Sequence, residues 1–260
     1  MEDINLIHCP NEKEPYIIVF KSKGLPSAPL KEGEKSLVTY VLNLFPECKN
    51  VKGKKIIEYG LVHRLDTQTS GLIMMAETQE FYDAITKVQK EGHFFKTYHA
   101  FCHKNSSFVN SENGFPPFEM KKEKLNEWSE GKLTNDNFST DSFLVESFFR
   151  PYGKANSLVR PVTEKSGLKA RKKSGEKLYQ TLISLKNTDD KEKYEAVCVL
   201  KNGFRHQVRC HLAWAGFPII GDTKYNPRFA EKNKDLRFEA VALDFINPID
   251  GKEKHYILDF

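Results

Sequence analysis

The sequence lacks the marks of exported and membrane proteins. No apolar stretch approaches the roughly 20 residues that a membrane-spanning helix needs, because charged residues or glycine break the best runs. The N-terminus carries acids where a secretory signal has a basic start and an apolar core. The five cysteines are scattered and form no Cys-x-x-Cys pair, so neither a disulfide framework nor a thiolate zinc site is predicted. We therefore expect a soluble protein in a reducing, cytoplasmic compartment, with no membrane contact.

Motifs for nucleotides and metals are also missing. The chain contains no G-x-G-x-x-G, no G-x-x-x-x-G-K-[ST] and no H-E-x-x-H, so dinucleotide, Walker-type and simple zinc-protease sites are not predicted. His206, Cys210 and His211 are close in sequence. On a helix, however, these three positions do not converge on one point, and no second cluster completes a tetrahedral set. We predict no metal site.

The charge that is present is unevenly distributed. The chain has 260 residues, 39% of them hydrophobic, and a net charge of +5, which fits one large domain or two small ones with a substantial core. The basic segment, residues 150–177, holds nine Lys or Arg against two Glu, so the remainder is slightly acidic. A nearly neutral body with one basic segment is typical of proteins that bind a polyanion, because bound phosphates release counterions. A solvated, lysine-rich mobile loop is the alternative.

Hydrophobic periodicity predicts a mixture of strands and helices. The predicted strands are 16–20, 71–76, 94–102, 143–149, 178–185, 194–200, 238–245 and 255–259. The predicted helices are 36–44, 79–91 and 204–215, the second between an N-cap at Thr78 and a stop at Gly92. Residues 104–140 show no sustained period, which indicates a polar insertion. The basic segment is predicted to be a long connection.

One carboxylate stands in a turn between two apolar stretches, in the sequence His63-Arg64-Leu65-Asp66. Beside a guanidinium an aspartate keeps its charge and stays a competent nucleophile. A loop aspartate also commonly caps its own turn through backbone amides. On these four residues alone, the capping role is the favoured interpretation.

Two Ser-x-x-Lys strings offer a different chemistry. Ser129–Lys132 and Ser166–Lys169 have the spacing with which a lysine amine activates a serine hydroxyl in Ser–Lys hydrolases. Both lie in polar, loop-like sequence, where chance supplies such matches. A hydrolase is therefore a minor alternative.

Three motifs in a fixed order change the interpretation of the aspartate. They are HRLDTQTSG at 63–71, the K-x-Y-x-A strand at 96–100, and GFRHQVRCHLAWAGFPIIGD at 203–222. Together they resemble the RluA-type pseudouridine synthases, whose patterns are H-R-L-D-x-x-T-S-G, K-x-Y-x-A and G-x-x-H-Q-[IV]-R-x-H-L-A-x-x-G-x-P-[IL]-x-G-D. The resemblance spans about 16–260. It leaves no room for the small N-terminal S4 domain of many relatives.

The resemblance implies a fold. We expect an α+β protein with a mixed, mainly antiparallel sheet that is flanked by helices and carries a central catalytic cleft. A single catalytic domain would cover residues 1–260, with the polar insertion at about 104–140 and the basic segment at 150–177 as additions to it.

The resemblance also implies an activity: isomerisation of specific uridines to pseudouridine in structured RNA. Ribosomal RNA of the large subunit is the first expected substrate and transfer RNA the second. RNA is the expected partner of a monomeric enzyme that needs no cofactor. The basic segment would then contact RNA.

Site residues follow from the same motifs. Asp66 corresponds to the indispensable aspartate, Arg209 to its ionic partner, and Tyr98 to the aromatic residue that stacks on the uracil. The residues assigned to substrate binding are Arg64, Lys96, His63, Arg205 and His206. Each role has a simpler alternative: a phosphate contact for Arg209, a core aromatic for Tyr98 and a structural salt bridge for Arg64.

A second hypothesis is a catalytically silent RNA-binding or ribosome-assembly protein with the same fold. The complete set of Asp66, Tyr98 and Arg209 argues against it, since a protein relieved of catalysis need not keep all three.

Overall fold

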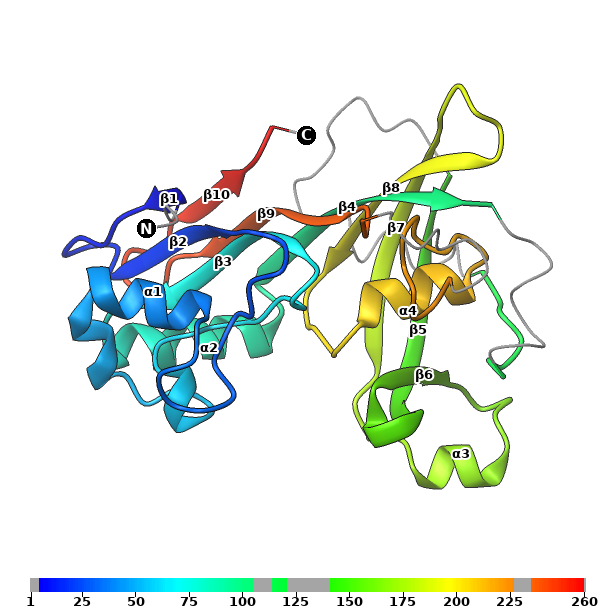
Figure 1. The fold of residues 1–260 in the computed structure, drawn as a ribbon, viewed down its shortest axis with the longest axis horizontal. Coiled ribbons are helices and arrows are strands. Elements are labelled where there is room, and N and C mark those ends of the chain that lie inside the picture. The colour runs from blue at the N-terminus through cyan, green and yellow to red at the C-terminus, as the bar shows by residue number, and fades with distance from the viewer. Residues whose placement is uncertain (1–4, 105–113, 121–140, 227–234, 260) are drawn as a thin grey trace. The chain divides into compact units, whose positions relative to one another are not determined.

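The chain forms two compact units (Figure 1). The computed structural model describes residues 5–104, 114–120, 141–226 and 235–259. Unit 1 comprises Met1–Lys96 and Glu239–Phe260, and unit 2 comprises Thr97–Phe238. The chain leaves unit 1 within strand β4 (Phe94–His103) and returns to it within strand β9 (Phe238–Ile246). Unit 1 is therefore built from both ends of the sequence.

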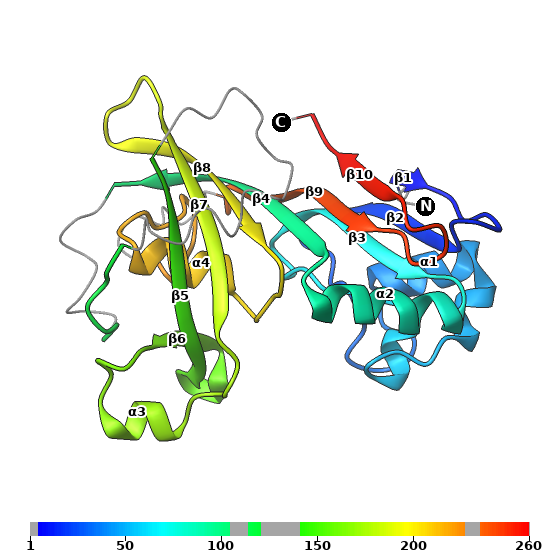
Figure 2. The same ribbon diagram turned by 180° about the vertical axis from the view of Figure 1, so that it is seen from behind.

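Unit 1 is a mixed sheet whose helices α1 and α2 lie on one face (Figures 1 and 2). Its strand order is β1–β2–β3–β9, with β10 paired to β9. The pairs β1·β2, β2·β3 and β9·β10 are antiparallel, whereas β3 pairs with β9 in parallel. The elements are β1 (Asn5–His8), β2 (Tyr16–Lys21), β3 (Ser70–Ala76), β10 (Glu253–Ile257), α1 (Leu37–Leu44), α2 (Gln79–Glu91) and the short 3-10 helices η1 (Pro46–Asn50) and η2 (Ile56–Glu58).

Helix α2 has the predicted bounds because residues next to it in the sequence cap both of its ends. The Thr78 side chain accepts the backbone N–H of Phe81, and Gly92 ends the helix with φ +87°. Phe81 and Ile85 point into a core with side chains of β2, β3 and β9. Burial of each such side chain stabilises the fold by about 1.5–3 kcal/mol. This core supports the β3 end of the HRLD segment.

Unit 2 is built on strands in the order β4–β8–β7–β5–β6, of which the pairs β8·β7, β7·β5 and β5·β6 are antiparallel (Figure 2). Helix α4 packs against β6 and β7, and all eight of its residues are buried. The elements are β5 (Asp141–Tyr152), η4 (Lys154–Asn156), β6 (Leu158–Val162), α3 (Leu168–Lys172), β7 (Tyr179–Asn187), β8 (Lys193–Leu200) and α4 (Gln207–Trp214). No helix in the described ranges has the length and apolar character needed to cross a bilayer.

The mixed, mainly antiparallel α+β architecture is thus confirmed, but the start of the last helix is not. The predicted helix 204–215 begins only at Gln207, because His206 has a left-handed backbone with φ +57°. Such a residue cannot belong to a right-handed helix. Arg205 consequently lies before the helix and does not share a helical face with Arg209.

The prediction that the basic segment is one long connection is also wrong. It contains the end of β5, the strand β6 and the short helix α3. Strand β6 was not predicted because it contains Pro161, and proline cannot donate a hydrogen bond to a neighbouring strand. The strand tolerates it because β6 is the last strand in the order of its sheet. The predicted insertion 104–140 lies largely outside the described residues.

All five cysteines are free thiols, and Cys9 alone among them is exposed. Burial raises the pKa of Cys48 to about 12. Burial also raises the pKa values of the other three above the usual range; these are Cys102, Cys198 and Cys210. The buried thiols therefore remain protonated near neutral pH.

Candidate active site

Asp66 stands at the head of a tight turn in unit 1. Its backbone carbonyl accepts the N–H of Thr69 at 3.0 Å. The preceding Leu65 is buried, whereas Asp66 itself is partly exposed. A buried apolar neighbour thus anchors a partly exposed aspartate.

A second loop holds this turn from the side. Ser27 is buried, and its hydroxyl both donates to the carbonyl of Leu65 at 2.8 Å and accepts the N–H of Leu65 at 3.0 Å. The N–H of Gly24 donates to the carbonyl of Thr67 at 2.8 Å. The backbone on both sides of Asp66 is therefore fixed by the loop that follows β2.

Lys21, the last residue of β2, lies at the centre of this arrangement and was not predicted. It is fully buried, and its ammonium donates to three carbonyls, those of Ser22, Leu25 and Thr67, at 2.8–3.3 Å. Burial lowers the pKa of Lys21 to about 8, and the negative charge of Asp66 opposes that fall. The buried ammonium of Lys21 is therefore near enough to Asp66 for the two opposite charges to attract each other. A lysine at a strand end is normally exposed, so the sequence offered no reason to single it out.

The glycine that closes the HRLDTQTSG motif has a steric reason to be glycine. Gly71 has φ +122°, and a Cβ built there would lie 2.1 Å from the carbonyl oxygen of Ala240 in β9. Beside it, the Ser70 hydroxyl donates to the Glu239 carboxylate at 2.6 Å. The motif's last residues thus fasten β3 to β9 directly after the Asp66 turn.

Arg64 and His63 have structural partners. Arg64 donates to the buried Glu58 carboxylate at 3.2 Å, while its side chain remains 56% exposed. His63 accepts the N–H of Met74 in β3 through Nε2. Burial, together with the charge of Lys96, lowers the pKa of His63 to about 3, so the ring is neutral. The salt bridge foreseen for Arg64 is present, and it leaves an exposed guanidinium surface. The predicted contacts of both residues with substrate stay predictions.

Lys96 is an enclosed cation rather than a surface one. Its side chain is buried, with Nζ 5.0 Å from the centre of the Phe94 ring. Its assignment to substrate binding stays a prediction.

In unit 2, Arg209 forms a two-pronged ion pair with Asp222. Arg209 Nε and Nη2 each donate to one Asp222 oxygen at 2.8 Å, and both residues are buried. This geometry orients the guanidinium and fixes its plane. Arg209 is therefore not the exposed phosphate contact that was its alternative role.

Asp222 is itself held by the backbone that follows it. It accepts the N–H groups of Lys224 and Tyr225 at 2.9 and 3.1 Å. Burial alone would raise the pKa of Asp222, but the Arg209 hydrogen bonds and charge outweigh burial and the pKa lies below its usual value. The motif's final Gly-Asp thus positions its arginine, which the sequence pattern did not reveal.

Two further polar residues of α4 fasten the helix to its sheet. His211 lies between the hydroxyls of Ser147 and Thr181, at 2.9 and 2.7 Å, and Gln207 donates to the carbonyl of Gln180 at 2.8 Å. Burial lowers the pKa of His211 to about 3. These residues of the H-Q-V-R-x-H string are therefore structural supports for Arg209.

Arg205 and His206, both predicted to bind substrate, also have protein partners. Arg205 donates to the carbonyls of Asn156 and Leu158, in the turn before and at the start of β6. His206 Nδ1 lies 3.2 Å from the Tyr225 hydroxyl. Their predicted roles in substrate binding stay predictions.

Tyr98 is an aromatic residue of β4 with 7% of its surface exposed. Its ring stacks on Phe238 with centroids 5.1 Å apart and an interplanar angle of 14°. The alternative role of Tyr98 as a core aromatic residue is therefore consistent with its contact with Phe238. Stacking of Tyr98 on a uracil stays a prediction.

Each unit therefore groups part of the predicted set. Unit 1 holds Asp66, Arg64, His63 and Lys96, and unit 2 holds Tyr98, Arg209, Arg205 and His206. The predicted pairing of Arg209 with Asp66 stays a prediction. Across the described ranges, no three His, Cys, Asp or Glu side chains are grouped as ligands for a metal ion.

Most of the chain matches one protein family. A family model described as RNA pseudouridylate synthase matches residues 15–214. The chain therefore belongs to the RNA pseudouridylate synthases, a family of isomerases that act on RNA. Its motifs place it in the RluA type within that family, as the resemblance implied.

Individual relatives agree with this assignment. The chain is 23% identical over 242 residues to the "Uncharacterized RNA pseudouridine synthase YlyB" of Bacillus subtilis, covering 93% of this chain and 65% of that protein. It is 24% identical over 263 residues to the "Ribosomal large subunit pseudouridine synthase C" of Buchnera aphidicola, covering 97% and 67%. The chain thus spans about two thirds of the length of these relatives.

Solved structures support the fold. Human RNA Pseudouridylate Synthase Domain Containing 1 has a TM-score of 0.65 and 13% identity, with 100% of this chain and 84% of that chain covered. Human RNA Pseudouridylate Synthase Domain Containing 4 has a TM-score of 0.59 and 16% identity, with 98% and 88% covered.

Proposed function

We propose that this protein converts specific uridines of structured RNA to pseudouridine, with Asp66 as the essential carboxylate. The reaction breaks the bond between ribose C1′ and uracil N1, turns the base and joins C1′ to carbon 5, so it needs neither redox chemistry nor a cofactor. The observation that carries the proposal is the partly exposed Asp66 at the head of a turn, whose flanking backbone is fixed by Ser27 on one side and Gly24 on the other.

In this proposal the carboxylate acts as nucleophile or base on the target nucleoside, and each role requires its ionised form. The buried Lys21 ammonium supplies one nearby positive charge. Arg209, with its plane fixed by Asp222, is the second cation for the carboxylate. Tyr98 stacks on the uracil while the base turns.

The target uridine must leave its stack, which costs a few kcal/mol that protein contacts offset. Arg64 suits this role, because its guanidinium stays more than half exposed while Glu58 holds it in place. We propose large-subunit ribosomal RNA as the first substrate and transfer RNA as the second. The name of the Buchnera relative supports that order.

The test is direct. The purified protein is incubated with ribosomal and transfer RNA, and pseudouridine is scored by chemical labelling and sequencing. Wild-type protein should form product, and Asp66→Asn should lower the rate by at least about a hundredfold. Asp83→Asn, on the exposed side of α2, is the matched control and should retain full activity.

Two results would overturn the proposal. One is product formation by Asp66→Asn at the wild-type rate. The other is RNA binding by the wild type with no product on either RNA class, which would identify a silent RNA-binding protein.

A further inference from the structure

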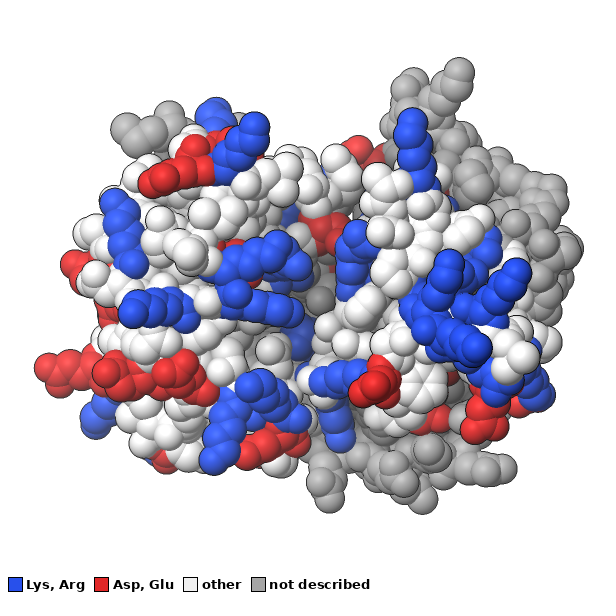
Figure 3. All heavy atoms as spheres, turned by 90° about the horizontal axis from the view of Figure 1, so that it is seen from below, with Lys and Arg blue, Asp and Glu red and all other residues white. Residues whose placement is uncertain are grey.

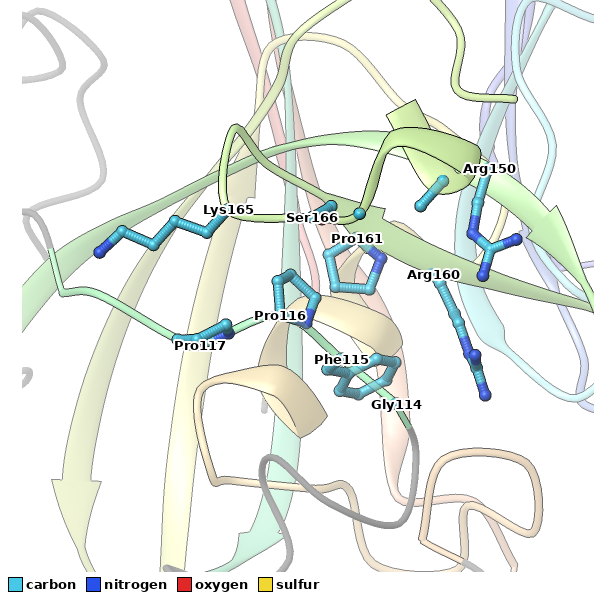
Figure 4. Close-up of a pocket in the computed structure, with 11 residues that line it drawn as sticks. Gly114, Phe115, Pro116, Pro117, Arg150, Arg160, Pro161, Lys165 and Ser166 are labelled. Atoms are coloured by element: carbon cyan, nitrogen blue, oxygen red, sulfur yellow. The ribbon is translucent and has the colours of Figure 1, made fainter. Parts of the chain in front are cut away.

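Unit 2 contains a cavity of about 280 Å³, lined by residues of β5, β6, the segment after β6 and residues 114–117. Two arginines stand together at one end of it, and apolar side chains form its wall (Figure 4). The lining residues the argument uses are Phe115, Pro116, Arg150, Arg160, Pro161 and Lys165. The volume is slightly below the roughly 300–1,000 Å³ of sites for whole small molecules. It fits a smaller group.

The two arginines are direct cross-strand neighbours. Arg150 of β5 pairs with Arg160 of β6 in the antiparallel register, and like charges at directly opposite positions destabilise a sheet. Both guanidinium groups lie near the ring of Tyr152, with Cζ 5.8 Å and 3.2 Å from its centre. An aromatic ring only partly offsets the repulsion of two full charges.

No carboxylate resolves this repulsion in the described parts of the chain. Within those ranges, no Asp or Glu oxygen lies within 4.0 Å of either guanidinium. Burial lowers the pKa of Arg160, and the charge of Arg150 lowers it further. Two adjacent arginines with no carboxylate partner among the described residues, at one end of a cavity, form a site that is complementary to an anion.

The rest of the cavity is mostly uncharged. The Trp214 indole donates to the carbonyl of Pro116 at 2.7 Å, which fixes the apolar wall of Phe115 and Pro116 onto α4. Lys165, at the opposite end, is paired with Glu119 and points away from the arginines. The positive charge of the cavity is therefore concentrated at Arg150 and Arg160.

The surroundings identify the kind of anion. Most residues that line the cavity belong to the basic segment, and Figure 3 shows Lys and Arg side chains gathered on the face of unit 2 formed by β6 and α3. A paired guanidinium surface matches the geometry of phosphate oxygens, and a polyanion gains further from neighbouring cations. A single free phosphate would use only the cavity.

We propose that the Arg150/Arg160 cavity binds one phosphodiester group of the RNA, with its oxygens between the two guanidinium groups and the attached ribose against Phe115 and Pro116. This inference rests on the proposed function, since it takes RNA to be the substrate. It adds a contact that lies outside the residues assigned to the target uridine.

The first experiment measures RNA affinity against salt. The double variant Arg150→Gln/Arg160→Gln should bind a labelled transcript of large-subunit ribosomal RNA at least about tenfold more weakly. The slope of log K against log salt should become shallower by about 1–2. The control Lys87→Gln/Lys90→Gln, on exposed positions of α2, removes the same charge and should change neither value appreciably.

A second experiment tests the anion site without RNA. Inorganic phosphate should raise the unfolding temperature of the wild type, because a ligand that binds only the folded state stabilises it. It should raise that of the double variant less. In low salt, the variant should unfold at the same temperature as the wild type or higher, since it lacks the like-charge pair. This comparison also verifies that the variant folds.

The inference would be overturned if the double variant had the RNA affinity and the salt slope of the wild type. It would also be overturned if phosphate no longer raised the unfolding temperature of the variant but its RNA affinity were unchanged. The proposed function is judged separately. The double variant should still form pseudouridine at saturating RNA, whereas Asp66→Asn should bind RNA normally and form pseudouridine at least about a hundredfold more slowly.

Discussion

At the scale of single residues, Arg209 and Asp222 place opposite charges in a region that solvent hardly reaches. Each charge is tolerated there because the other supplies two hydrogen bonds. Asp222 also accepts two backbone N–H groups, so its loss would release the turn at 222–225 as well. The pair thus couples the orientation of a proposed active-site cation to the stability of unit 2.

We predict that Asp222→Asn lowers the free energy of unfolding by about 3–5 kcal/mol, because it removes the buried negative charge that holds Arg209 by two hydrogen bonds. Urea denaturation measures the loss. Replacing both partners, as in Arg209→Met/Asp222→Leu, should cost less than the two single changes together. Additive losses would contradict the idea that the two residues act as a unit.

The burial of Lys21 leads to a second prediction, which concerns the pH dependence of stability. Its pKa is about 8 in the folded protein and 10.5 as an ordinary lysine. Between these values the unfolded chain binds the extra proton, so stability rises with pH across that window. Below pH 8 the burial penalty is present in full.

The measurement is the free energy of unfolding of wild type and Lys21→Met at pH 7 to 10. The free energy of unfolding of the wild type minus that of Lys21→Met should increase with pH above pH 8. Below pH 8 this difference should stay constant. Other titrating groups cancel in the comparison. Lys87→Met, at an exposed position, should show no such shift, and a flat difference for Lys21→Met would contradict the burial of its charge.

At the scale of elements, the start of α4 depends on one backbone angle. His206 adopts φ +57° and so separates Arg205 from the helix. We predict that His206→Val unfolds about 1–2 kcal/mol more easily than His206→Gly, because only glycine adopts this conformation without strain. Both variants lose the contact with Tyr225, so thermal denaturation of the pair isolates the backbone effect. Equal stabilities would show that the angle is not strained.

Elements whose signals are local could be predicted, and those set by tertiary contacts could not. Helix α2 carries both of its caps in its own sequence, at Thr78 and Gly92. The left-handed His206 and the edge strand that accepts Pro161 depend on neighbours distant in sequence. Strand β1 was missed because half of it is exposed and its pattern is short.

The same distinction holds for the candidate site. Asp66, Tyr98 and Arg209 could be named because ordered motifs contain them. Lys21 and Asp222 could not be assigned their roles, since burial and the partners of a charged side chain are absent from a sequence pattern.

At the scale of the whole molecule, unit 1 is complete only with residues 239–260, which follow unit 2 in the sequence. The family match ends at residue 214, but β9 and β10 follow later. Leu243 and Phe245 complete the core beneath β3 and α2. The core that supports the Asp66 turn is thus completed by strands that follow unit 2 in the sequence.

We therefore predict that a chain truncated after Phe238 fails to fold unit 1, although it retains all three motifs. Loss of the core contacts of two large apolar side chains costs several kcal/mol, comparable with the whole stability of a domain. Circular dichroism and hydrogen exchange of residues 16–96 would report the loss. Native protection there in the truncated chain would contradict the prediction.

The single exposed thiol provides a built-in gauge of folding. In the native protein Cys9 is available to a thiol-selective reagent, while the four enclosed sulfhydryls are not. Complete unfolding makes all five reactive. The number of labels per chain, read by intact-mass spectrometry after a short pulse, therefore counts open and closed molecules directly, and it does so for each variant above without adding a probe.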